Sequence, residues 1–110
     1  MSDRPVDLLI EDILEAIRRI ESYVSDASKE SFLADQMMQD AVIRNITVIG
    51  EIVSRLPEYF TISQSKIPWS RIRGMRNRLV HDYLGIDLEL VWEVTQKDLQ
   101  EFHRQIQGIL

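Results

Sequence analysis

Apolar residues recur every three or four positions along most of this chain, which is the spacing of an amphipathic helix. The first such segment begins near Asp3, with Pro5 in its opening turn. Its apolar face consists of Leu9, Ile13, Ile17, Ile20 and Val24. The pattern predicts a first helix over residues 3–24, followed by a turn at residues 26–28.

A second, longer helix is predicted over residues 29–56, where Ser28 or Ser31 can cap its start and Pro57 ends it. At about 100° per residue, its apolar positions cover more than half of the circumference, so we expect neighbours on several sides. These positions are Phe32, Met37, Met38, Ala41, Val42, Ile43, Ile46, Val48, Ile49, Ile52, Val53 and Leu56.

The polar positions of this second helix have structural interpretations. The narrow stripe opposite the apolar arc consists of Asp40, Arg44, Thr47 and Glu51. Its charged members are interpreted as structural ion pairs rather than catalytic groups. Asn45 falls inside the apolar arc, where an amide needs hydrogen-bond partners. It is interpreted as a contact between helices or, alternatively, as part of a cleft floor.

The remaining segments complete a helical bundle. A short helical turn is predicted at residues 58–62, and residues 67–70 open a third main helix that must end by Gly85. Asp87 can cap a short helix through Val94, and Thr95 can cap a last helix over residues 96–109. The buried face of that last helix is predicted to be Leu99, Phe102, Ile106 and Ile109. We therefore predict an all-α, up-and-down bundle of four to five helices in a single domain, residues 1–110.

The composition fits a cytoplasmic protein without a bound cofactor. Cysteine is absent, which excludes disulfides and thiolate metal sites. The first dozen residues carry acids and no long apolar run, so we expect neither a signal peptide nor a membrane span.

The charge is distributed very unevenly. The net charge is -5, yet residues 61–81 contain no acid and carry +5, while the other 8 basic and 18 acidic residues total -10. The five basic residues are Lys66, Arg71, Arg73, Arg76 and Arg78. A polyanion responds to such local positive potential. A solvated basic helix face would give the same count.

Helical angles separate these arginines. On one continuous helix Arg76 lies inside an apolar stripe formed by Trp69, Ile72, Met75, Leu79, Val80 and Tyr83. A guanidinium there requires a carboxylate, a phosphate or a polar cleft. Arg71 and Arg78 lie off the stripe and are interpreted as surface charges, whereas Arg73, Asn77 and His81 share a polar face.

Arg76 and His81 are five residues apart, about 140° around a regular helix. They meet only if the helix distorts after Leu79 or if two subunits contribute. Nearby arginines favour the neutral form of a histidine, which is a competent general base. Arginine stabilises charge on a phosphoryl group, so the pair suits metal-independent cleavage of RNA by its own 2′-hydroxyl. Alternatively, His81 is a cap or a solvated side chain; His103 is interpreted as structural only.

These residues resemble a known family. Arg76-Asn77-Arg78-Leu79-Val80-His81 matches the HEPN motif, and with Asp82 and Tyr83 it becomes the Arg-x4-His-x-Tyr form of the HepT-like toxins. Those toxins are the ribonuclease partners of minimal nucleotidyltransferase antitoxins. Residues 39–45, 49–51, 67–69, 74–77 and 91–93 also look like segments of that group, so the resemblance covers nearly the whole chain.

The resemblance implies a HEPN-like bundle that forms a homodimer, with Arg76 and His81 of both subunits in one shared cleft. His81 would act as base or acid, Arg76 would hold the scissile phosphate, and Asn77 would orient one of them. The antitoxin would transfer AMP from ATP to Tyr83, although Tyr83 is alternatively a core aromatic residue. Arg73 and Arg78 would extend the RNA-binding track.

Two other functions fit the same residues. A non-catalytic module would use the basic cleft to bind a nucleotide or a partner protein. A purely structural partner would scaffold the antitoxin through the broad apolar arc of the second helix.

Overall fold

The structure is a computed structural model that describes residues 4–80 and 85–109. Within these residues the regular elements are helical, apart from one isolated bridge between Val80 and Ile86, which confirms the predicted all-α fold. The helices are α1 (Val6–Val24), α2 (Lys29–Leu33), α3 (Gln36–Arg55), α4 (Glu58–Ser63), α5 (Trp69–Arg73), α6 (Met75–Leu79), α7 (Leu88–Glu93), the π-helical turn η1 (Val94–Asp98) and α8 (Leu99–Gln107).

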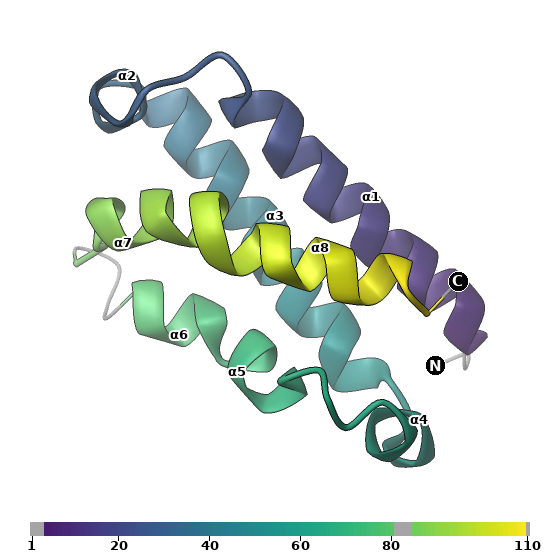
Figure 1. Cartoon of the computed structure of the whole chain (residues 1–110). Helices are drawn as coiled ribbons and strands as arrows, with labels where there is room; N and C mark the ends of the chain where they lie inside the picture. The colour runs from purple at the N-terminus through teal and green to yellow at the C-terminus, as the bar shows by residue number, and fades with distance from the viewer. Residues whose placement is uncertain (1–3, 81–84, 110) are drawn as a thin grey trace.

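Four rods of alternating direction form the bundle (Figure 1). The long helices α1 and α3 run antiparallel and pack together, the α5–α6 rod lies along α3, and the α7–η1–α8 rod packs on α1. The predicted apolar face of α1 is buried, as are Leu99, Phe102 and Ile106 of α8. The up-and-down arrangement is therefore as predicted.

The start of α1 differs slightly from the prediction. The helix begins at Val6, and Pro5 is its N-cap rather than a residue of its first turn. The Pro5 carbonyl accepts the backbone N–H groups of Leu8 and Leu9, so it closes the first turn from outside.

The predicted helix over residues 29–56 is wrong in one respect, because it is broken between α2 and α3. Asp35 adopts an extended conformation, and its side chain accepts a hydrogen bond from the backbone N–H of Met38. The buried Gln39 amide donates to the carbonyls of Phe32 and Leu33 at 2.9 and 3.1 Å. Both helix ends at the break thus have side-chain partners.

The break also narrows the apolar arc of the second helix. Met37, which was predicted to widen that arc, is 84% exposed in the first turn of α3. Ala41 and Val48 are half-buried, whereas Ile52 is buried. Ser28 starts α2 as expected, in a reciprocal capping box with Ser31.

The predicted separate helices near the C-terminus are joined. Asp87 caps α7 by accepting from the backbone N–H of Leu90, as expected. Thr95 does not cap a new helix; it lies buried inside η1, and its hydroxyl donates to the Trp92 carbonyl at 2.7 Å. The π-helical turn therefore keeps α7 and α8 in one continuous rod.

No helix in the described part of the chain is both long enough and apolar enough to cross a membrane.

A close approach between α3 and α5 fixes the position of the α5–α6 rod. A Cβ atom added at Gly50 of α3 would lie 3.3 Å from the Arg73 carbonyl oxygen at the end of α5. The absence of a side chain at Gly50 is what allows the two backbones to come this near.

We expect Gly50→Leu to lower the free energy of unfolding by about 1–3 kcal/mol, because a side chain at this crossing forces α5 away from α3. Gly108→Leu is the matched control, since Gly108 is exposed and a Cβ there meets no atom nearer than 3.5 Å. Urea denaturation of both variants measures the difference, and equal losses would contradict this account of the crossing.

Candidate functional site

The basic segment lies on two short helices rather than on one. The third helix predicted from residue 67 onward is divided at Gly74, where φ is -86° and ψ is 0°. A ψ near zero departs from the regular α-helical value of about -42°, so α6 takes a new direction after α5. Side-chain angles counted on a single continuous helix are therefore only approximate across this segment.

The apolar stripe is buried largely as predicted. Trp69 and Ile72 of α5 and Met75 and Leu79 of α6 are buried, and Val80 is half-buried. Trp69 also donates its indole N–H to the Gln64 carbonyl and packs edge-on against Phe102. These contacts hold both short helices against the rest of the bundle.

The predicted surroundings of Arg76 and Arg78 are wrong. Arg76 is exposed instead of lying within the buried stripe. Arg78, which was interpreted as a surface charge, is half-buried, and its Nε and Nη2 atoms are buried without a hydrogen-bond partner among the described residues. The angles counted on one continuous helix thus hold for the buried apolar residues on both sides of Gly74, but they fail for Arg76 and Arg78, which follow the interruption.

Helix α6 ends immediately before the predicted catalytic histidine. Val80 is extended, with φ -120° and ψ 100°, so the helix does distort after Leu79, the first of the two alternatives. Val80 pairs with Ile86, and the backbone N–H of Asp87 donates to the Leu79 carbonyl at 3.0 Å. The chain on both sides of residues 81–84 thus meets at the C-terminal end of α6.

Two predicted site residues, His81 and Tyr83, lie outside the described residues. The other predicted site residues are placed on α5 and α6. Arg73 ends α5, and Arg76, Asn77 and Arg78 belong to α6. Arg73 and Asn77 are exposed, as their predicted polar face requires.

The five basic side chains of the segment differ in their ion pairs. Arg71 Nη2 lies 3.0 Å from Asp98 Oδ2, and Arg78 Nη2 lies 3.8 Å from the same oxygen. Within residues 4–80 and 85–109, the other three make no ion pair: Lys66, Arg73 and Arg76. These three unpaired cations are therefore available to an anionic ligand.

Asp98 is a contributor that sequence reasoning missed. It ends the π-helical turn η1, 20 residues beyond Arg78 in the sequence. No motif or periodicity marks this residue, because its contact with the basic segment arises from the packing of two rods.

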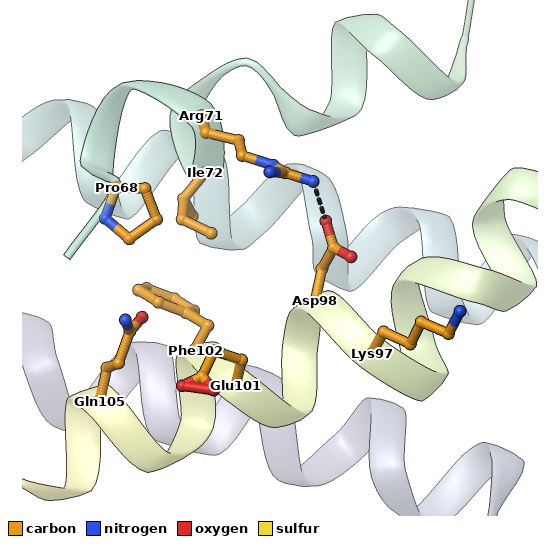
Figure 2. A pocket seen from close by; sticks show the side chains of 8 residues that line it. All are labelled: Pro68, Arg71, Ile72, Lys97, Asp98, Glu101, Phe102 and Gln105. Atoms are coloured by element: carbon orange, nitrogen blue, oxygen red, sulfur yellow. Dashed lines mark hydrogen bonds and ion pairs between the residues drawn. The ribbon is translucent and has the colours of Figure 1, made fainter.

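A pocket of about 250 Å³ lies between α5 and the η1–α8 rod (Figure 2). Pro68, Ile72 and Phe102 provide its apolar walls, while the Arg71–Asp98 ion pair lies at one edge. Arg76 does not line this pocket. Asn77 does not line it either, so neither of the predicted catalytic residues that the structure describes forms this pocket.

The contacts of His103 and Asn45 are consistent with the structural roles that the sequence suggested for them. His103 Nδ1 lies 2.8 Å from Glu21 Oε2, a contact that ties α8 to α1. The buried Asn45 amide donates to the Ala41 carbonyl of its own helix, so this hydrogen bond lies within α3 rather than between helices.

The predicted ion-pair stripe on α3 is not observed. Its charged members are exposed and pair with no described residue: Asp40, Arg44 and Glu51.

Comparisons with known proteins cover almost the whole chain. The family model described as "Ribonuclease HepT-like" matches residues 13–109. A Methanocaldococcus jannaschii protein named "Gamma-glutamylcyclotransferase and putative RNase" is 38% identical over 107 residues, which is 97% of this chain and 48% of that protein. This chain thus spans about half the length of that relative.

Two further relatives match along most of their own length. A "Putative RNase" of Caldanaerobacter subterraneus subsp. tengcongensis is 36% identical over 101 residues, covering 92% of this chain and 90% of the relative. A "Probable ribonuclease HepT" of Thermococcus cleftensis is 38% identical over 90 residues, covering 82% of each chain. No solved structure matches the chain significantly.

The exposure of Arg76 has a direct consequence for stability. We expect Arg76→Ala to change the free energy of unfolding by no more than about 0.5 kcal/mol, as for other exposed residues without partners. Leu79→Ala, three residues along the same helix, removes a side chain with 0% exposure and should cost about 2–5 kcal/mol. Thermal or urea denaturation distinguishes the two, and a large loss for Arg76→Ala would show that this arginine is structural.

Proposed function

The chain belongs to the HepT-like ribonuclease family, and we propose that it is the toxin of a toxin–antitoxin pair, an endoribonuclease that cleaves cytoplasmic RNA without a metal ion. The observation that carries this proposal is the state of Arg76. It is an exposed cation without an acidic partner among the described residues, and it lies on the helix that ends just before His81.

The proposed reaction is transesterification by the 2′-hydroxyl of the substrate. His81 takes the proton from this hydroxyl, the 2′-oxygen bonds to phosphorus, and the bond from phosphorus to the 5′-oxygen breaks as that oxygen gains a proton. Arg76 stabilises the negative charge that accumulates on the phosphoryl oxygens, and Asn77 orients one of the two groups. The products are a 2′,3′-cyclic phosphate end and a 5′-hydroxyl end.

The segment around the motif supplies the electrostatic attraction for RNA. Arg73 is exposed and has no ion pair with a described residue, so it extends the track of phosphate contacts from Arg76 along α5. Arg78 shares Asp98 with Arg71, and its part in binding therefore depends on that carboxylate.

We further propose that the active form is a homodimer with Arg76 and His81 of both subunits in one cleft. This proposal rests on the resemblance to the HepT-like toxins, which implies such a shared cleft; because α6 ends at Leu79, the angles of a regular helix do not by themselves require a second subunit. A shared cleft also allows the active site to be complete only after assembly.

Loss of either proposed catalytic side chain should abolish cleavage. We expect Arg76→Ala and His81→Ala to lower the cleavage rate of single-stranded RNA by at least about 100-fold, since each removes charge stabilisation or proton transfer. Arg104→Ala, an exposed arginine paired with Glu101 on α8, is the control and should retain activity. Purified proteins and a labelled RNA measure this, and cleavage that persists in both variants would refute the assignment.

The same assay tests the dimer and the alternative function. Co-refolded Arg76→Ala and His81→Ala chains should recover part of the activity if the two subunits share one cleft. RNA or nucleotide binding without any cleavage by the wild-type protein would instead favour the non-catalytic binding module.

A minimal nucleotidyltransferase is the proposed partner, and Tyr83 is its proposed target. Transfer of AMP to the Tyr83 hydroxyl releases pyrophosphate from ATP and places a bulky, negatively charged group two residues after His81. Such a group competes with RNA for both space and positive potential.

Co-expression with the nucleotidyltransferase should therefore add AMP to the protein. Intact-mass measurement should show increments of one or more AMP units in the wild type and none in Tyr83→Phe, and the modified protein should lose RNA cleavage. Tyr59→Phe, at an exposed tyrosine of α4, is the control and should still be modified. Increments that persist in Tyr83→Phe would exclude Tyr83 as the target.

A further inference from the structure

We propose that Asp98 is a positioning residue for the basic segment, holding Arg71 and Arg78 on either side of the bend at Gly74 and leaving Arg73 and Arg76 open to RNA. This inference rests on the RNA-binding function proposed above. It assigns a role to a carboxylate that lies outside the motif and on a different rod of the bundle.

The geometry is that of one acid between two helices. Asp98 Oδ2 lies 3.0 Å from Arg71 Nη2 of α5 and 3.8 Å from Arg78 Nη2 of α6. Figure 2 shows the Arg71 side chain extended along the pocket edge toward Asp98. Although α5 and α6 are not one continuous helix, this shared partner on the opposite rod holds one arginine side chain from each of them near the same carboxylate.

Burial makes the Asp98 carboxylate a better-defined partner than a typical surface acid. Its side chain is 24% exposed, against 60% for Arg71 and 39% for Arg78. The buried Nε and Nη2 atoms of Arg78 have no hydrogen-bond partner among the described residues, and within that part of the chain Asp98 is the only acid at ion-pair distance from Arg78.

Charge gives Asp98 its second effect. Among the described residues it is the only acid within ion-pair distance of the acid-free segment. Pairing with Asp98 occupies two of the five cations and leaves three, among them Arg73 and Arg76, which neighbour the bend. Near the bend, the positive charge that stays unpaired among the described residues is therefore that of Arg73 at the end of α5 and Arg76 in α6.

The position of Asp98 in the chain also supports a specific role. It is the last residue of η1. Such π-helical turns within α-helices are rare, and those that occur frequently lie at functional sites. Ion pairs of this exposure contribute little to the free energy of folding. Loss of the Asp98 charge should therefore leave the fold intact and change only the ion pairing and side-chain positions of Arg71 and Arg78.

The test compares Asp98→Asn with Glu101→Gln, which removes an acid one turn further along α8 and releases Arg104 instead. Binding of a single-stranded RNA oligonucleotide is measured over a range of salt concentrations. For Asp98→Asn we expect tighter binding at low salt, with a log–log salt slope steeper by about 0.7 for each released arginine. Glu101→Gln should keep the wild-type slope.

Cleavage by the same proteins reports on positioning. In Asp98→Asn we expect KM to fall while kcat falls by about tenfold or more, because RNA binds in registers that do not place its phosphate at Arg76. Asp98→Glu, which keeps the charge, should restore most of the wild-type kcat. A merely structural role would lower stability without separating KM from kcat.

A readout without RNA separates this inference from the proposed function. Phenylglyoxal modifies free guanidinium groups, and mass spectrometry should show faster labelling of Arg71 and Arg78 in Asp98→Asn than in the wild type, with Arg73 unchanged. Unchanged labelling, or a salt slope equal to that of Glu101→Gln, would overturn the role of Asp98. Failure of the wild type to bind RNA, with labelling as expected, would overturn only the ribonuclease proposal.

Discussion

The burial of Ile72, Met75 and Leu79 is the constraint on which the arrangement of the basic segment depends. These side chains join the core that α1 and α3 form, and they can do so only if α5 and α6 lie along α3. With that face inward, Arg73 and Arg76 are exposed. Burial of apolar surface thus determines where the free positive charge appears, although the charges themselves contribute little to folding.

The sequence predicts the rods of the bundle well because each rod buries a face with a regular period. It does not predict the breaks, because these depend on side chains that contact the backbone of a neighbouring helix. Gln39 reads as one more polar residue in a helical pattern, but its amide satisfies carbonyls at the end of α2. The π-helical turn is missed for the same kind of reason, since Thr95 resembles an N-cap in sequence and is buried in a continuous helix.

In the candidate site, too, some features follow from the local sequence and others depend on how the helices pack. The motif and its chemistry follow from residues close together in the sequence. The environment of each arginine does not, because the helix is interrupted at Gly74 and no periodicity reveals that interruption. No local sequence pattern identifies Asp98, because it contacts Arg71 and Arg78 only when the two rods pack together. Residues proposed to carry out chemistry can thus be named from a local motif, whereas those proposed to orient them become apparent only in the packed structure.

The charge distribution connects these parts into one mechanism under the proposed function. A protein with net charge -5 repels RNA over most of its surface, so productive encounters depend on the acid-free segment. Positive charge there must be sufficient to attract a phosphate, yet too many free cations would bind RNA in registers that miss Arg76. In this proposal Asp98, on the neighbouring rod, permanently limits the number of free cations. An adenylate on Tyr83 would instead cancel the same positive potential reversibly, two residues from the proposed catalytic histidine. Both act on one quantity, the local positive potential, and that is why a single added nucleotide would suffice to silence the site.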